Sequence, residues 1–381
     1  MVIKNLIDFI KKTYGNRDYI PLHEPIFFGK EKDYLIQTIN STFVSSVGDF
    51  INEFENAVED YTNSKYAIAT VNGTAALHVA LKLAGVQSKD EVITQSLTFV
   101  ATCNAIRYCN AQPVFADIDK KTLSLCSNSV KIFLEENCEI RNDGLCWNKK
   151  TNKIVRACMP MHTFGFPADL DQLRKLCDKY NISLVEDAAE SLGSMYKKKH
   201  TGTIGKISAI SFNGNKIITT GGGGMILTND ANLAQKAKHM TTTAKVKHKW
   251  DYLHDNVGYN YRLPNINAAL GVAQMELLPK ILTAKRMLAE KYQEWGKKNG
   301  FQFIKEQENT KANYWLNTIL TNNLTERNIV LEQTNNSGVR TRPAWFPMHK
   351  LNINSKFQKT DLSNTNWLND RLINLPSSAI I

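Results

Sequence analysis

The feature of this sequence that most limits its fold is an alternation, beginning near residue 65, of short apolar runs with segments of helical periodicity. The apolar runs are mostly rich in β-branched residues and are predicted to be strands: 65–70, 91–95, 113–118, 154–162 and 182–187. The segments between them carry apolar residues at helical spacing and are predicted to be helices: 74–85, 99–109, 129–136 and 169–180. This alternation predicts an α/β fold in which helices cover both faces of a mostly parallel sheet.

The regular alternation of predicted strands and helices ends after this region. Residues 206–213 and 223–229 are predicted to be two strands that add an antiparallel edge to the sheet. A long helical pattern covers 271–295, and Pro279 is expected to break or kink it. Strands at 314–321 and 339–345, with a helix at 324–338 between them, predict a small C-terminal α+β unit.

Three structural units follow from these patterns. We expect an N-terminal helical arm (1–26), a large α/β domain (27–265), and a small C-terminal domain with its linking helix (266–381). The polar stretch 138–153 contains Asp143-Gly144, a turn signal that predicts a surface β-hairpin.

Composition narrows the possible functions. The net charge of +11 suggests nucleic-acid binding, but the lysines are scattered and no groove-reading motif accompanies the basic clusters 197–200 and 245–249. We therefore expect no nucleic-acid partner, and attribute the charge to a solvated surface or to attraction of an anionic substrate. No apolar run reaches the roughly 18 residues of a membrane span, and the N-terminus lacks a signal-peptide pattern. The prediction is a cytoplasmic protein without a membrane partner.

The seven cysteines carry no recognisable metal or disulfide pattern. They include no C-x-x-C pair and no cluster with histidine. Reduced, structural thiols are the default for such a set, so neither a metal site nor a disulfide framework is predicted.

The first candidate site is Asn72-Gly73-Thr74-Ala75, which stands between a predicted strand and a predicted helix. Backbone N–H groups at a helix start carry partial positive charge, and glycine lets a phosphate approach closely. Thr74 adds a hydroxyl donor. Taken alone, the segment is better explained as an ordinary helix N-cap.

The second candidate is the predicted strand that ends in Glu186-Asp187. Ligands bind at the carboxyl ends of the strands in open α/β sheets. A carboxylate there can hold a pyridinium nitrogen protonated, which a pyridoxal-phosphate (PLP) ring needs in order to accept electrons. A helix-capping aspartate explains this segment alone about equally well.

The third candidate is Lys216, which lies between a predicted strand containing Ser211 and four consecutive glycines, Gly221 to Gly224. Ordering four glycines costs backbone entropy, so such a run points to close approach or unusual dihedral angles. A lysine desolvated near cationic or ring groups can lose its proton and form an imine. A surface lysine beside a glycine-rich turn is the alternative, but the order of the three segments favours cofactor binding.

Together these segments resemble the DegT/DnrJ/StrS family of PLP-dependent sugar aminotransferases, which have the fold type I of aspartate aminotransferase. The resemblance runs from 21–25 to 342–345, with further matching segments at 98–102, 162–165 and 258–263. Segment 41–48 resembles the LegC-type branch, associated with 4-amino sugars for nonulosonic acids such as legionaminic acid. The resemblance implies a large PLP-binding domain and a smaller C-terminal α+β domain.

The resemblance also implies a role for each matching residue. Lys216 would bond covalently to PLP and then carry the proton between substrate and cofactor carbons, while Asp187 would pair with the pyridinium nitrogen. Glu190 would lie near the ring hydroxyl, where many relatives carry Gln or His. The other cofactor contacts would be Phe99 on the ring; Gly73, Thr74, Ala75 and Ser211 at the phosphate; and Asn260 and Arg262 from the neighbouring subunit of a homodimer with shared active sites.

The implied reaction transfers an amino group from glutamate to a keto carbon of a nucleotide-diphosphate sugar. The LegC-like segment favours C4 of a 6-deoxy sugar, giving an amino sugar for surface polysaccharide or nonulosonic acid synthesis. The sequence does not determine which nucleotide the sugar carries, whether C3 or C4 receives the amino group, or whether the protein is a dimer or a tetramer. Residue type and family placement predict substrate contacts at His162, Arg340, Arg342, Trp345 and His349.

Two alternatives accompany this prediction. A PLP-dependent sugar dehydratase of the same fold would carry histidine in place of Lys216. A non-catalytic PLP-binding sensor need not keep the lysine, the aspartate and the phosphate-binding segment together.

Overall fold

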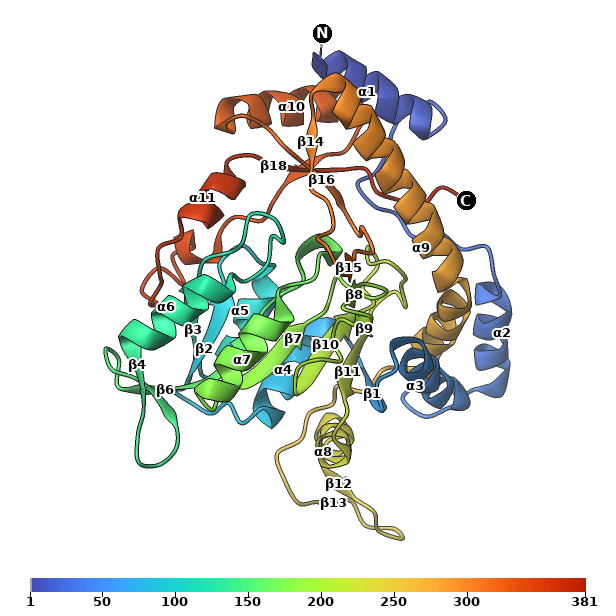
Figure 1. Cartoon of the computed structure of the whole chain (residues 1–381). Helices are drawn as coiled ribbons and strands as arrows, with labels where there is room; N and C mark the ends of the chain where they lie inside the picture. The colour runs from blue at the N-terminus through green and yellow to red at the C-terminus, as the bar shows by residue number, and fades with distance from the viewer. Residues whose placement is uncertain (1) are drawn as a thin grey trace.

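The main sheet of the computed structural model, which describes residues 2–381, follows the strand order β1-β11-β10-β7-β6-β2-β3 (Figure 1). Its strands are β1 (Tyr66–Thr70), β2 (Glu91–Gln95), β3 (Gln112–Ala116), β6 (Lys153–Met159), β7 (Ser183–Asp187), β10 (Ile207–Ser211) and β11 (Gly224–Thr228). The strands from β10 to β3 run parallel, which confirms the predicted mostly parallel sheet. The antiparallel strand β11 does not form the edge, however, because it pairs with both β10 and β1.

Helices cover both faces of this sheet (Figure 1). One face packs against α4 (Gly73–Leu83), α5 (Val100–Tyr108) and α8 (Ala231–Thr241), and the other against α6 (Ser127–Asn137) and α7 (Leu170–Lys179). Successive side chains of a strand point to opposite faces. Val92 therefore packs with α4 and α5, whereas its neighbour Ile93 packs with α6 and α7.

The predicted hairpin at 138–153 is confirmed. Strands β4 (Cys138–Ile140) and β5 (Cys146–Asn148) pair antiparallel, and β5 continues the sheet by pairing with β6. Gly144 adopts a left-handed conformation with φ of 73°, which suits the tight connection.

The longest helix, α9 (Asn265–Asn299), runs without a break through Pro279, so of the two effects predicted for this proline, a break or a kink, the break is wrong. Proline removes one backbone donor from a helix interior and costs about 3 kcal/mol. Burial of Leu278 and Ile281 against the main core offsets that cost. Helices α2 (Glu31–Ser41) and α3 (Asp49–Thr62) pack along α9 and link it to the large domain.

The C-terminal unit is an antiparallel sheet with order β14-β16-β18-β17, confirming the small α+β prediction. Its elements are β14 (Gln302–Phe303), β16 (Asn317–Leu320), α10 (Leu324–Asn336), β17 (Arg342–Pro343), α11 (Ser363–Asn369) and β18 (Leu372–Leu375). Helix α1 (Val2–Thr13) packs on this unit, since Leu6 and Ile10 share a core with Ile319 and Val330. Helix α1 is thus part of the C-terminal core, and Figure 1 shows it beside α10.

The remaining elements are short. Strand β15 (Thr310–Lys311) pairs with β8 (Met195–Tyr196), which pairs with β9 (Lys199–His200) and so ties the C-terminal unit to the segment after β7. Strands β12 (Lys245–Val246) and β13 (Leu253–His254) form a separate hairpin, and η1 (Thr163–Gly165) and η2 (Met348–Lys350) are single turns. No helix within 2–381 is both long and apolar enough to cross a membrane.

The four-glycine run brings two backbone segments into contact. A Cβ atom on Gly224 would lie 2.4 Å from the backbone carbonyl carbon and oxygen of Asn72. The same atom on Gly222 would meet only the carbonyl oxygen of Val71, at 3.9 Å. Close approach, the reason inferred from the sequence, therefore applies to Gly224 and not to Gly222.

Gly224→Ala is expected to lower the free energy of unfolding by roughly 1–3 kcal/mol, because the added methyl group must displace backbone atoms of Asn72. Urea unfolding followed by circular dichroism measures the effect. Gly222→Ala is the matched control and should change stability by about 0.5 kcal/mol or less. Equal losses in the two variants would contradict this account.

Candidate active site

A cavity of about 360 Å³ opens at the carboxyl ends of β7 and β10, beside the start of α4. It gathers residues from distant parts of the chain. The predicted site residues that line it are Gly73, Thr74, Phe99, Asp187, Glu190, Ser211, Lys216 and Trp345.

Lys216 lies in the turn after β10 with its side chain largely buried. Its Nζ is 3.1 Å from Oε1 of Glu190 and 4.1 Å from the centre of the Trp315 ring. The indole N–H of Trp315 donates to the backbone oxygen of Asn215 at 2.7 Å, which holds the ring beside the lysine. The amine is therefore presented to the cavity from a fixed position.

Asp187 is the last residue of β7, and its buried carboxylate faces the same cavity. It accepts hydrogen bonds from Thr102 Oγ1 at 2.7 Å and from the Ala189 N–H at 3.2 Å. Burial raises the pKa of Asp187, although these hydrogen bonds and the charge of Lys216 oppose the rise. A carboxylate held in this way can pair with a protonated ring nitrogen.

The start of α4 forms a cradle for an anion. Asn72 caps the helix, since its Oδ1 accepts from the Ala75 N–H at 2.8 Å. A Cβ on Gly73 would lie 2.8 Å from Cβ of Ser211, so only glycine lets the end of β10 approach this closely. First-turn amides and the hydroxyls of Thr74 and Ser211 suit a phosphate. The Ala75 amide already bonds to Asn72, and Ala75 does not line the cavity, contrary to its predicted phosphate contact.

Aromatic side chains also line the cavity. Phe99 precedes α5 and is about half exposed, with its ring centre 6.3 Å from that of Trp345. Trp345 in turn packs against Phe164 at 4.9 Å. A cavity lined by both aromatic rings and polar groups suits a planar heteroaromatic cofactor.

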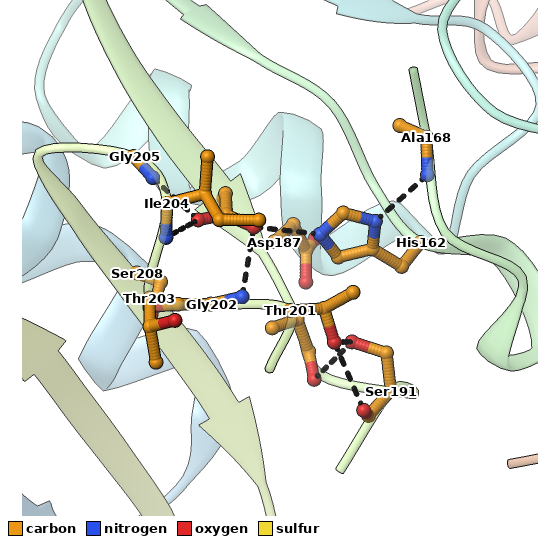
Figure 2. Close-up of polar contacts among 12 residues, drawn as sticks. His162, Ala168, Asp187, Ser191, Thr201, Gly202, Thr203, Ile204, Gly205 and Ser208 are labelled. Carbon is orange, nitrogen blue, oxygen red and sulfur yellow. Dashed lines mark hydrogen bonds and ion pairs between the residues drawn. The ribbon is translucent and has the colours of Figure 1, made fainter. Parts of the chain in front are cut away.

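His162 lies elsewhere, and its predicted substrate contact is contradicted by its position. The ring is fully buried: Nε2 is 3.0 Å from Oε2 of Glu186, and Nδ1 accepts from the Ala168 N–H at 3.1 Å. Figure 2 shows the His162 ring and its hydrogen bond to Ala168. Both nitrogens are used, so His162 has no polar atom for a substrate. The sequence did not reveal this because Glu186 points to the face of β7 opposite Asp187.

The Glu186 carboxylate is the centre of this hydrogen-bond network. Besides His162, it accepts from the N–H groups of Gly202 at 2.7 Å, Ile204 at 2.8 Å and Gly205 at 2.6 Å. Burial by itself would raise the pKa of Glu186, but these hydrogen bonds outweigh it and lower the pKa. These hydrogen bonds attach the loop after β9 to the face of β7 opposite Asp187.

Glu186→Ala is expected to lower the free energy of unfolding by roughly 3 kcal/mol or more, because it leaves one buried and two partly buried amides, and the buried His162 ring, without their acceptor. Glu139→Ala, which removes an exposed pair with Arg141, should cost about 1 kcal/mol or less. Urea unfolding at several pH values measures both. The lowered pKa means that the Glu186 contribution is complete above the usual carboxyl pKa and is lost as pH falls through the native one. A wild-type pH dependence retained in Glu186→Ala would contradict the assignment.

Three other predicted substrate residues lie outside the cavity. His349 is buried, with Nδ1 2.7 Å from Ser96 Oγ, and burial lowers its pKa to about 4. Arg342 lies in the exposed strand β17, and the Arg340 N–H bonds to the backbone oxygen of Ile20. Of the predicted substrate residues, therefore, only Trp345 reaches the cavity.

Asn260 and Arg262 also lie outside the cavity of their own chain. The Asn260 Oδ1 accepts from Arg262 Nη2 at 3.2 Å, and Arg262 forms an isolated bridge with Thr70 at the end of β1. Their contribution to a neighbouring subunit stays a prediction.

Several lining residues were not singled out from the sequence. Thr102 follows Phe99 by three positions, a helical spacing that places both on one side of α5, and this signal was available. Trp315 comes from the C-terminal unit and carries no local signal. The lining residues missed in this way include Thr102, Asn213, Asn215 and Trp315.

Comparison with known proteins decides the family. A model of the DegT/DnrJ/EryC1/StrS aminotransferase family matches residues 28–380. The chain belongs to this family. GDP-perosamine synthase of Escherichia coli O157:H7 is 38% identical over 364 residues, which cover 94% of this chain and 93% of that protein.

Solved structures share the fold. PseC of Helicobacter pylori, an aminotransferase involved in pseudoaminic acid biosynthesis, superposes with a TM-score of 0.83 at 24% identity, covering 94% of this chain and 93% of its own. The PLP form of Spr1654 from Streptococcus pneumoniae gives 0.83 at 21%, with the same coverage. The predicted fold type I architecture is thereby confirmed.

As a member of this family, the protein is an aminotransferase that uses PLP. Its cavity fits that cofactor, because the glycine-lined cradle at α4 suits the phosphate and the buried Asp187 suits the ring nitrogen. When bound, PLP supplies a ring that accepts the electron pair released at the substrate carbon.

Proposed function

We propose that this aminotransferase transfers the amino group of glutamate to a keto carbon, C4, of a nucleotide-diphosphate 6-deoxy sugar. The product would be an amino sugar for surface polysaccharide, such as O-antigen, or for a nonulosonic acid such as legionaminic acid, made in the cytoplasm. The observation that carries the proposal is the meeting of the Lys216 amine, the Asp187 carboxylate and the α4 cradle in one cavity.

The names of similar proteins support a sugar substrate. GDP-perosamine synthase of E. coli and PseC of H. pylori both belong to amino-sugar synthesis by name. The resemblance of segment 41–48 to the LegC-type branch supports C4. The name of the E. coli protein makes a GDP-linked sugar the first substrate to test.

Each residue has a defined task in this proposal. The α4 start and Ser211 bind the cofactor phosphate, and Phe99 covers one face of the ring. Asp187 keeps the ring nitrogen protonated, while Nζ of Lys216 forms the covalent bond to PLP and later carries a proton to the sugar carbon. Trp345 contributes to the substrate side of the cavity.

The test is the visible absorption spectrum of the protein with PLP, before and after addition of glutamate. We expect a yellow band from lysine-bound cofactor that bleaches with glutamate and returns when a keto-sugar nucleotide is added. GDP-, UDP- and dTDP-linked 3-keto and 4-keto sugars, followed by mass spectrometry of the product, identify the substrate. A band that glutamate does not change would favour the sensor alternative and overturn the proposal.

We also propose a homodimer whose active sites are shared. Two groups of exposed apolar residues support a partner surface, since such patches on soluble proteins mark interaction sites. The first follows α2 and the loop after it, and the second lies on the β12–β13 hairpin. The exposed residues are Ile36, Ile39, Phe43, Val44 and Val47 in the first group, and Trp250, Tyr252, Leu253 and Val257 in the second.

Mixing two inactive variants tests this arrangement. If Arg262 completes the partner's site, Lys216→Ala and Arg262→Ala homodimers should both be inactive. Subunit exchange should restore about a quarter of wild-type activity, because half of the random dimers are mixed and each carries one intact site. Absence of any recovery, with exchange verified by mass spectrometry, would contradict shared sites.

A further inference from the structure

Among the charged side chains that line the cavity, Lys216 and Glu190 form an ion pair. Nζ of Lys216 is 3.1 Å from Glu190 Oε1 and lies 4.1 Å from the centre of the Trp315 ring. The Asp187 carboxylate is instead bonded to the hydroxyl of Thr102. The carboxylate in contact with the lysine amine is therefore that of Glu190.

Glu190 is placed where its charge can change near neutral pH. Its carboxyl group is fully buried, and its second oxygen accepts the Phe164 N–H at 2.9 Å. Burial raises the pKa of Glu190 to about 7; Lys216 and the Phe164 amide lower it, and the Asp187 charge raises it. Lys216 and Asp187 are the titratable groups that face it, while Asn313 contributes a neutral amide to the Glu190 backbone oxygen.

We propose that Glu190 accepts the ammonium proton of Lys216, so that the lysine becomes a neutral nucleophile inside the cavity. An N–H bond of Lys216 breaks and an O–H bond forms at Oε1 of Glu190. The neutral amine could then bond to the aldehyde carbon that PLP would supply, and the two remaining amine hydrogens would leave with the aldehyde oxygen as water. This inference rests on the proposed function, because it requires Lys216 to be the residue that bonds PLP.

The physical reason is the cost of burying charge. Two buried ions are expensive unless their attraction offsets desolvation, and a proton transfer across 3.1 Å converts them into a neutral acid and a neutral amine. Bulk water competes poorly for this proton, because the Lys216 side chain is only 13% exposed and that of Glu190 only 1%. Glu190 is thus the acceptor in direct contact with the amine.

Replacing Glu190 with glutamine removes the proton acceptor without changing how the side chain packs. Glu190→Gln keeps the shape of the side chain and an oxygen for the Phe164 N–H, but it cannot accept a proton at neutral pH. Many relatives carry Gln or His here by the resemblance noted above, so the variant is expected to fold. Proton acceptance by Glu190 would then be a property of chains that carry glutamate.

The experiment measures the rate at which cofactor-free protein takes up PLP, from the growth of the lysine-bound band in stopped flow across the neutral pH range. Wild-type loading should rise with pH around an inflection near about 7, as Glu190 loses its proton. Glu190→Gln should load on the order of 100-fold more slowly at neutral pH. Its rate should approach the wild-type rate only at alkaline pH.

A second variant separates proton transfer from structure. Glu190→Ala should also load slowly, and added formate, a small carboxylate that can occupy the vacated space, should restore the rate in a concentration-dependent way. Thermal unfolding of each cofactor-free variant checks the fold. Wild-type loading kinetics in Glu190→Gln, or no response of Glu190→Ala to formate, would overturn the proposal.

The outcome is distinguishable from failure of the proposed function. If wild type forms the band and glutamate bleaches it, the aminotransferase role of Lys216 stands whatever the Glu190 variants do. If wild type forms no band at all, the proposed function itself fails.

Discussion

Lys216→Ala is expected to abolish the lysine-bound cofactor band and to reduce amino transfer by roughly 10⁴-fold, because the variant loses both nucleophile and proton carrier. Of the cavity-lining residues within 2–381, Lys216 is the only lysine. The fold should survive, since the Glu190 left without its partner can be protonated near neutral pH. Absorption spectra and a coupled glutamate assay measure the effect.

Two control variants sharpen this result. Lys216→Arg keeps a cation beside Glu190 but cannot form the imine, so it should be as inactive as the alanine variant. Lys206→Ala changes an exposed lysine just before β10 and should retain wild-type activity. A lysine-bound band in Lys216→Ala would show that another lysine bonds PLP.

Asp187→Asn is expected to slow the glutamate half-reaction by roughly 100- to 1000-fold, because an amide cannot stabilise a positive charge on the ring nitrogen. The asparagine oxygen can still accept from Thr102, so the local hydrogen bond and the fold should persist. Single-turnover kinetics with glutamate measure the rate apart from cofactor affinity.

Thr102→Val is the matched control for Asp187. It removes the hydroxyl that donates to the carboxylate at 2.7 Å but leaves the negative charge in place. We therefore expect a smaller loss than in Asp187→Asn. A full-rate Asp187→Asn enzyme would mean that the ring nitrogen does not depend on this carboxylate.

Local sequence patterns correctly placed in the cavity those residues whose position is set by their own strand or turn. Asp187 ends a buried strand, and strand ends of a parallel sheet share one edge, so its place in the cavity followed from periodicity. Gly73 and Lys216 stand at the neighbouring turns. Their order along the chain, together with the family resemblance, predicted that they belong to one site, and they line one cavity.

Contacts between distant segments could not be predicted in this way. Trp315 reaches Lys216 from the C-terminal unit, and α1 buries Leu6 in a core formed mainly by residues beyond 280. His162 looked like a substrate ligand, but Glu186 on the hidden face of β7 holds its ring. Each of these depends on which surfaces meet after folding.

Local sequence patterns thus predicted the sheet-and-helix architecture, and the resemblance of the motifs predicted the family; both are confirmed, whereas the chemical roles of Lys216 and Asp187 stay predictions. Three features could be seen only in the folded structure. Strand β11 lies inside the sheet, α9 continues through Pro279, and Glu190 is the carboxylate beside Lys216. The reason is physical: periodicity and capping act over a few residues, whereas strand order, helix continuity and ion pairing follow from burial shared between remote segments.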